Sequence, residues 1–123
     1  MFKIVIDDSI FYNACRMAEQ SNASGIITMT HSGYSGFKIS SHRPSAGIFI
    51  FTDNRSLINA MSLVWGVRTF FYDKYESTDQ GIADTINILK EHQLLKHEDI
   101  VINIASVPIY EKGKANMIKL SYV

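Results

Sequence analysis

The chain has 123 residues, the size of a single domain, and 46% of them are hydrophobic, which is enough for a core without a metal ion or a disulfide. Lysine and arginine together number 12, and so do aspartate and glutamate, so no net field would gather nucleic acid. No apolar run approaches the roughly 20 residues of a membrane helix, and residues 1–6 are too short for a signal peptide. We therefore expect one cytoplasmic domain that has neither nucleic acid nor a membrane as a partner.

Helical and strand patterns alternate in the first half of the chain. Asp7, Asp8 and Ser9 are candidate N-caps, which predicts that a helix begins there after a lead-in of residues 1–7. Cys15, the only cysteine, lies on the apolar side of this helix, a position typical of a buried structural thiol. The elements expected here are a helix ending near 21–22, a buried strand at 26–29, a short helix at 34–41 that Pro44 stops, and a strand at 47–51.

The second half of the chain continues the alternation. Asp53 and Asn54 are expected to cap a helix whose apolar stripe runs to Trp65, with Gly66 as a left-handed C-terminal cap. Ser77 and Gln80 form a capping-box pattern. After the first of these helices, the expected elements are a strand at 67–72, a helix from about 77 to 92, a strand at 100–105, a polar loop at 111–114 and a last strand at 116–123.

This order predicts an α/β fold in which residues 1–123 form one domain. Strands that alternate with helices form a mainly parallel sheet covered on both faces, with right-handed crossovers. The link before the last strand is short, which favours an antiparallel direction for that strand. The expected architecture is a three-layer α/β/α sandwich around a five-stranded, mostly parallel sheet with an antiparallel last strand.

The segment from Thr30 to Ser35 is the candidate functional loop. It follows a buried strand and opens a helix, and ligands of parallel sheets bind at the carboxyl ends of strands. The hydroxyls of Thr30, Ser32 and Ser35 can donate to oxygens, Gly33 lets the backbone approach a ligand, and the amides of a helix start favour an anion. A bland alternative is that these serines and threonines only cap the helix. The phosphate interpretation predicts binding and not catalysis, whereas the capping alternative predicts neither.

Several short motifs occur in an order that resembles the C-terminal, non-catalytic domain of pyruvate kinase. The resemblance covers roughly residues 8–123 and agrees with the predicted order of elements, whereas the catalytic barrel of that enzyme has no counterpart in this sequence. The motifs are Ser32-Gly33-Tyr34-Ser35, Ser41-His42-Arg43-Pro44, Trp65-Gly66-Val67, Asp99-Ile100-Val101-Ile102, Gly113 and Asn116.

The resemblance implies that the domain binds a sugar-phosphate effector, often fructose 1,6-bisphosphate, and helps to assemble a homo-oligomer around the catalytic barrel of a parent enzyme. The family's phosphate role is carried onto Thr30, Ser32, Gly33, Tyr34 and Ser35, and a second anion contact onto Lys112, Gly113 and Lys114. No cofactor is expected in this domain, because magnesium and potassium belong to the barrel. The sequence departs from the family's usual pattern at Ser35-Gly36 and at Ala115, where a threonine hydroxyl is lost.

Other conspicuous residues are assigned structural roles. His31 and His42 lack the paired spacing of a metal site, although His31 is a possible ligand contact. Arg43 is expected to bond the last carbonyls of a helix, and Trp65 to lie in the core or an interface. Two other functions stay open: a flavodoxin-like electron carrier, whose flavin phosphate would occupy the same loop, and a purely structural module that pairs subunits through its first helix and last strand.

Overall fold

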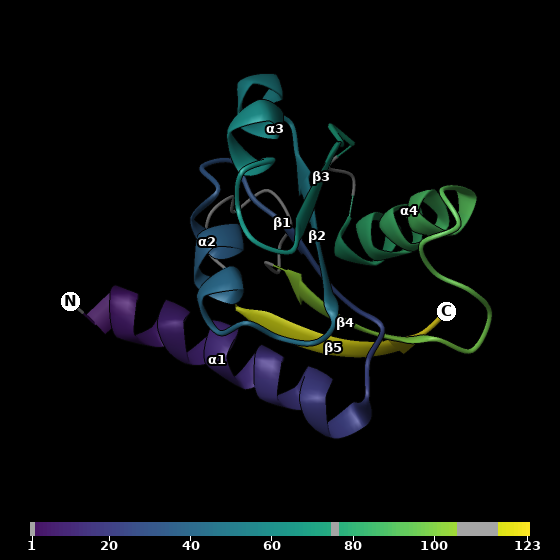
Figure 1. Cartoon of the computed structure of the whole chain (residues 1–123), viewed down its shortest axis with the longest axis horizontal. Helices are drawn as coiled ribbons and strands as arrows, with labels where there is room; N and C mark the ends of the chain where they lie inside the picture. The colour runs from purple at the N-terminus through teal and green to yellow at the C-terminus, as the bar shows by residue number, and fades with distance from the viewer. Residues whose placement is uncertain (1, 75–76, 106–115) are drawn as a thin grey trace.

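The computed structural model describes residues 2–74, 77–105 and 116–123, with side chains from residue 9 onward. Helices and strands alternate along the chain, and two strands close it (Figure 1). The elements are α1 (Phe2–Ser21), β1 (Gly25–Met29), α2 (Tyr34–Ser41), β2 (Gly47–Thr52), α3 (Arg55–Met61), β3 (Val67–Phe71), α4 (Thr78–Glu91), β4 (Ile100–Ala105) and β5 (Met117–Tyr122).

The strands form one five-stranded sheet in the order β3-β2-β1-β4-β5. The pairs β1–β2, β2–β3 and β1–β4 are parallel, whereas β5 pairs antiparallel with β4, so that Ile102 lies opposite Leu120. The predicted fold class and the predicted direction of the last strand are both confirmed. β1 is the central strand, and the loop that follows it is therefore flanked by the ends of β2 and β4.

Alternate residues of the strands enter two separate cores. Ile26, Ile48 and Ile102 pack with apolar side chains of α1, α2 and α3 on one face of the sheet. Ile27, Phe49 and Val101 pack with Leu89 of α4 and Leu95 on the other face. Burial on both faces explains why these strands are continuous apolar runs without a polar alternation. The resulting three layers, with α1, α2 and α3 opposite α4, are visible in Figure 1.

Two predicted helix boundaries are wrong. α1 begins at Phe2, so residues 2–7 are helical and Asp7, Asp8 and Ser9 lie inside the helix. Residues 2–6 contain neither glycine nor proline, the two residues that most disfavour a helix, so nothing in them prevents the helix from extending back to Phe2. Cys15 is buried at 8% exposure, as predicted.

The second wrong boundary is the end of α3. α3 ends at Met61, because the Ser62 amide bonds to Asn59 at 3.3 Å and the Val64 amide to Met61 at 3.0 Å, both three residues back. These tighter turns replace the helical spacing. Trp65 therefore lies in a turn and is 48% exposed, so its predicted place on the helical stripe and in the core is wrong, whereas a place in an interface stays a prediction. Gly66, with φ of 70°, leads into β3 and does not directly cap α3.

Candidate functional site

The central strand positions the loop between β1 and α2. β1 ends at Met29, and the Thr30 amide still donates to the Phe51 carbonyl of β2 at 3.0 Å. Gly33 has a φ of 88°, a left-handed conformation that turns the chain into α2. The loop thus lies at the carboxyl edge of the parallel strands, which confirms its predicted position.

Two of the predicted hydroxyls hold the loop itself together. The Gly33 amide donates to Thr30 Oγ1 at 3.0 Å, and the Tyr34 amide donates to Ser32 Oγ at 3.3 Å. Thr30 is buried, whereas Ser32 is exposed. Of the two, only Ser32 bonds an amide of α2, as the capping alternative predicts, whereas Thr30 bonds within the loop and the N-cap Gly33 has no side-chain bond. Each hydroxyl keeps its own hydrogen, which remains available to donate to an oxygen of a ligand.

Ser35 differs from these two residues. Its side chain is 7% exposed, and its hydroxyl has no hydrogen-bond partner. Ser35 lies in the first turn of α2, where its own amide and that of Gly36 have no carbonyl within the helix to bond. The positive end of the helix dipole adds to these donors. The helix start therefore offers several unsatisfied donors and no acidic residue in its first turn.

A histidine and an aspartate join the loop to its neighbour at the same edge of the sheet. His31 Nδ1 and Asp53 Oδ1 are 2.9 Å apart, and the Asn54 side-chain amide donates to the His31 carbonyl at 3.3 Å. Asp53 follows β2, as His31 follows β1. Sequence reasoning assigned Asp53 to a helix cap and missed this pair. The signal that could have found it is position, because the ends of adjacent parallel strands meet at one edge.

Close packing beneath the loop accounts for a departure from the family's pattern. A Cβ atom on Gly36 would lie 2.4 Å from Met61 Cε and 3.3 Å from Ile50 Cδ1. Met61 and Ile50 are fully buried. The absence of a side chain at Gly36 therefore leaves room for Met61, and this contact packs α2 against α3 and β2.

The remaining candidates are dispersed. The Arg43 guanidinium lies over the Trp65 ring at 4.7 Å, and the amides of His42 and Arg43 itself bond the carbonyls of Ile39 and Ser40 at the end of α2. The prediction that Arg43 bonds these carbonyls with its side chain is therefore wrong. Lys112, Gly113 and Lys114 lie outside the described residues.

The described residues form no metal site. Within residues 9–74, 77–105 and 116–123, no group of three or more His, Cys, Asp or Glu side chains lies close enough together to hold a metal ion.

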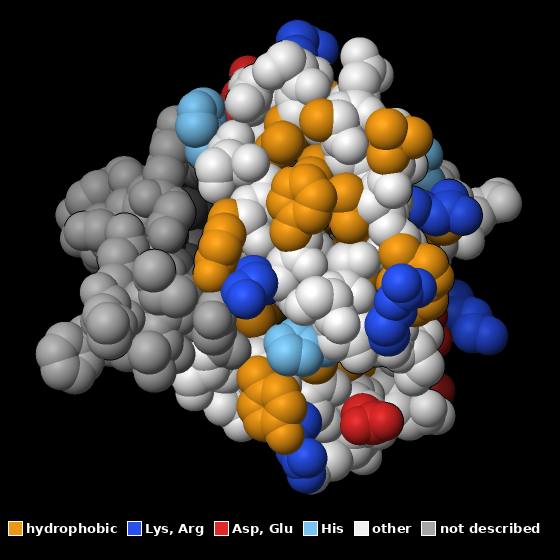
Figure 2. Space-filling model, turned by 60° about the vertical axis from the view of Figure 1, so that its left-hand side comes forward, with side chains coloured by type: hydrophobic (Ala, Val, Ile, Leu, Met, Phe, Trp, Pro, Cys, Tyr) orange, Lys and Arg blue, Asp and Glu red, His pale blue; other side chains and the backbone are white. Residues whose placement is uncertain are grey.

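The surface around α1 and α2 carries aromatic and basic side chains. Tyr12, Tyr34 and Phe37 are between 42% and 53% exposed. Figure 2 shows separate hydrophobic groups with Lys, Arg and His side chains between them. A continuous apolar patch is therefore not visible on this face. None of the described helices has the length and apolar character that crossing a membrane requires.

Comparisons with known proteins agree on one family. A family model described as the pyruvate kinase alpha/beta domain matches residues 8–121. Pyruvate kinase from Lactobacillus delbrueckii subsp. bulgaricus is 31% identical over 118 residues, which are 96% of this chain and 20% of that protein. The enzyme from Clostridium acetobutylicum is 31% identical over 94% of this chain and 24% of its own length. A crystal structure of a Cryptosporidium parvum pyruvate kinase superposes with a TM-score of 0.82 and 25% identity, covering 94% of this chain and 22% of that one.

Proposed function

Because this chain belongs to the pyruvate kinase alpha/beta domain family, we propose that it binds the phosphate group of a sugar phosphate at the loop Thr30–Ser35. The chain spans only about a fifth of the length of the relatives it matches. Phosphate binding would then act on a larger enzyme by favouring one of its conformations, which is how an effector regulates at a distance. The domain would serve regulation and subunit assembly.

The observation that carries this proposal is the buried hydroxyl of Ser35. A buried polar group without a partner costs roughly 1–3 kcal/mol, so natural structures seldom keep one without a role. The Ser35 hydroxyl lies in the same helical turn as two unsatisfied backbone amides, those of Ser35 and Gly36. A phosphate has enough acceptor oxygens for all of these donors, and the helix dipole favours its charge.

The parent activity proposed from the relatives is phosphoryl transfer from phosphoenolpyruvate to ADP. The magnesium and potassium ions of that reaction would be held by a catalytic barrel, and Thr30–Ser35 has no carboxylate that would bind them. This chain alone should therefore show no phosphoryl transfer when it is assayed with both ions. Measurable transfer by the purified chain would contradict the assignment of a purely regulatory role.

Calorimetric titration with phosphorylated compounds tests the binding proposal. The compounds are fructose 1,6-bisphosphate, ribose 5-phosphate, glucose 6-phosphate and AMP. Ser35→Ala should weaken binding by about tenfold or more, the loss of one strong hydrogen bond to a charged group. Ser62→Ala is the matched control, because the Ser62 hydroxyl donates to Asn59 on the exposed end of α3. The proposal fails if none of the four compounds binds, or if both variants bind as the wild type does.

A further inference from the structure

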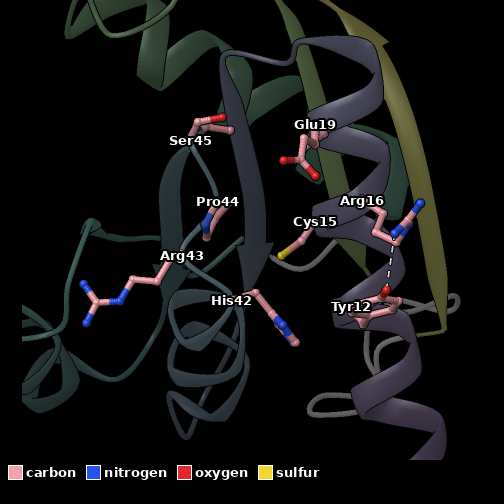
Figure 3. Close-up of a pocket in the computed structure, with 10 residues that line it drawn as sticks. Tyr12, Cys15, Arg16, Glu19, His42, Arg43, Pro44 and Ser45 are labelled. Carbon is pink, nitrogen blue, oxygen red and sulfur yellow. Dashed lines mark hydrogen bonds between the residues drawn. The ribbon is translucent and has the colours of Figure 1, made fainter.

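A second recess lies away from the loop Thr30–Ser35, at the other end of α2. It has a volume of about 170 Å³ and opens between the second half of α1 and the segment 42–46 that leads from α2 to β2 (Figure 3). Cys15 and Ala46 are buried beneath it, and Glu19 and Ser45 are exposed at its sides. Its lining is completed by Tyr12, Arg16, Ala18, His42, Arg43 and Pro44.

Helix direction places partial negative charge at this end of the molecule. In a parallel α/β fold the helices that precede strands end at the amino edge of the sheet, and α1 and α2 end at Ser21 and Ser41, before β1 and β2. Both helix C-termini carry partial negative charge. The last turn of α1 contains no basic residue, and Glu19 adds a full negative charge near it.

The two arginines beside the recess are directed elsewhere. Arg16 donates to the Tyr12 hydroxyl at 3.4 Å, and Arg43 lies over the Trp65 ring. In Figure 3 both guanidinium groups point away from the space between the segments, whereas the Glu19 carboxylate and the Cys15 sulfur point toward it. Among the described residues, Glu19 forms no ion pair or hydrogen bond with its side chain. Its carboxylate is therefore not directly paired, although Arg16 lies three residues before it on the same helix.

We propose that this recess binds a small organic cation, a primary or methylated ammonium compound, with its charged end on Glu19 and its carbon atoms over Ala18, Pro44 and Ala46. A cavity of about 150 Å³ can hold benzene, so the volume suits about six non-hydrogen atoms. The Tyr12 ring, whose centre is 5.7 Å from that of His42, already attracts one cation, since the Arg16 guanidinium lies over it at 5.9 Å. This inference is independent of the proposed phosphate site.

The pKa of the Cys15 thiol is consistent with a negative charge beside the recess. Burial, together with the nearby Glu19 carboxylate, raises the pKa of Cys15 to about 11. A carboxylate that disfavours a thiolate favours a cation at the same place. Cys15 also supplies a specific reporter, because it is the only cysteine and its sulfur faces the recess.

The test compares n-butylammonium with its neutral isostere 1-butanol in borate buffer free of amines and phosphate. Binding is followed by the amide resonances of α1 and residues 42–46 and by the rate at which methyl methanethiosulfonate modifies Cys15. We expect the ammonium to bind about tenfold more tightly than the alcohol and to slow the modification. In Glu19→Gln the ratio of the two affinities should fall to about one. Glu91 is an exposed acid on α4, so Glu91→Gln should leave the ratio unchanged.

Three results would overturn the inference. They are resonances that do not move at either segment, equal affinity for the two compounds in the wild type, and an unchanged preference in Glu19→Gln. Dispersed resonances in the spectrum of each variant verify that it is folded. Because no phosphate compound is present, the outcome does not depend on the titrations of the loop Thr30–Ser35.

Discussion

Gly33 is the residue on which the shape of the loop depends. Its φ of 88° is costly for any residue with a Cβ atom, and a Cβ would also lie 2.9 Å from Leu57 Cδ1 and 3.1 Å from the Met61 sulfur. Gly33→Ala should therefore lower the free energy of unfolding by about 2–4 kcal/mol, the sum of the conformational and overpacking costs. Urea unfolding followed by the fluorescence of Trp65 measures the loss.

Gly66→Ala separates these two costs. Gly66 also has a left-handed φ, of 70°, but a Cβ there would meet only Ile48 Cδ1 at 3.9 Å, an ordinary contact. Its substitution should cost only the conformational part, about 1–2 kcal/mol. If the two variants lose equal stability, packing of the loop against α3 contributes nothing, and the contact between Gly33 and Leu57 is not tight in solution.

At the residue scale, the sequence predicts residue types and positions but not partners. Gly33 and the hydroxyls of Thr30 and Ser35 stand out because a strand end, a glycine and a helix start follow one another. The pair of His31 and Asp53 joins residues 22 apart, and only the pairing of β1 with β2 brings them together. That Ser35 lacks a hydrogen-bond partner depends on packing around it, which no local pattern reveals.

At the scale of elements, a hydrogen bond ties the end of β3 to α4. The Tyr72 ring is buried against Phe51, and its hydroxyl donates to Asp84 Oδ2 at 2.7 Å. The Gln80 side chain donates to the other oxygen of Asp84 at 2.8 Å. The bond from Tyr72, followed by that from Gln80, holds the pKa of the Asp84 carboxyl below its ordinary value of 3.8.

Tyr72→Phe should weaken this connection. At pH 7 the variant should lose about 0.5–1 kcal/mol of unfolding free energy, since the carboxylate is partly exposed to water. A lowered pKa in the folded state stabilises the fold above pH 3.8, and this contribution disappears as the pH falls through the lower folded value. The difference between the wild type and the variant should therefore narrow in acid, as measured by urea unfolding at pH 7 and below pH 4.

Tyr122→Phe is the control for that comparison, because Tyr122 is 74% exposed on β5. Its unfolding free energy should equal that of the wild type at both pH values. A loss in Tyr72→Phe that is the same at pH 7 and in acid would show that the hydroxyl stabilises the fold by some means other than its bond to the Asp84 carboxylate.

The predicted boundaries and bonds of helices are wrong where a local sequence pattern is overridden by tertiary contacts. Ser77 does cap α4, since its hydroxyl accepts from the Gln80 amide at 3.1 Å, but the Gln80 side chain bonds Asp84 and not the cap. The helical spacing of apolar residues predicted that α3 runs to Trp65. The structure ends α3 at Met61, and Val64 contacts the core from the turn that follows. Short helices are held by tertiary contacts more than by their own spacing, and so their ends are hard to predict.

For the whole molecule, α2 separates two edges of opposite electrostatic character. Its start, at Tyr34, faces the carboxyl edge of the sheet with unsatisfied amides, and its end, at Ser41, faces the amino edge beside Glu19. The dipoles of helices in a parallel α/β fold all favour this polarity. The proposed anion and cation sites therefore follow from one topological fact, the common direction of β1 and β2.

The two outer strands of the sheet differ in how well they are protected. On β3, Arg68 is exposed, and the Arg55 guanidinium lies 3.8 Å from the centre of the Phe71 ring. Charged groups of this kind discourage pairing with another chain. β5 also carries a charged group, the exposed Lys119, but it adds two exposed apolar side chains, since Leu120 is 36% and Tyr122 is 74% exposed. We therefore expect assembly to use β5 and not β3.

Leu120→Lys tests the proposed assembly through β5. Two copies related by a two-fold axis would bring their β5 edges together, so that each Leu120 lies in a shared apolar contact. A lysine there removes this contact and places like charges close together, which should shift a dimer to the monomer at micromolar concentrations. Sedimentation velocity measures the shift. Leu63→Lys is the control, since Leu63 is 91% exposed in the turn after α3 and should leave the dimer intact. A wild-type chain that stays monomeric up to millimolar concentration would contradict assembly by this domain alone.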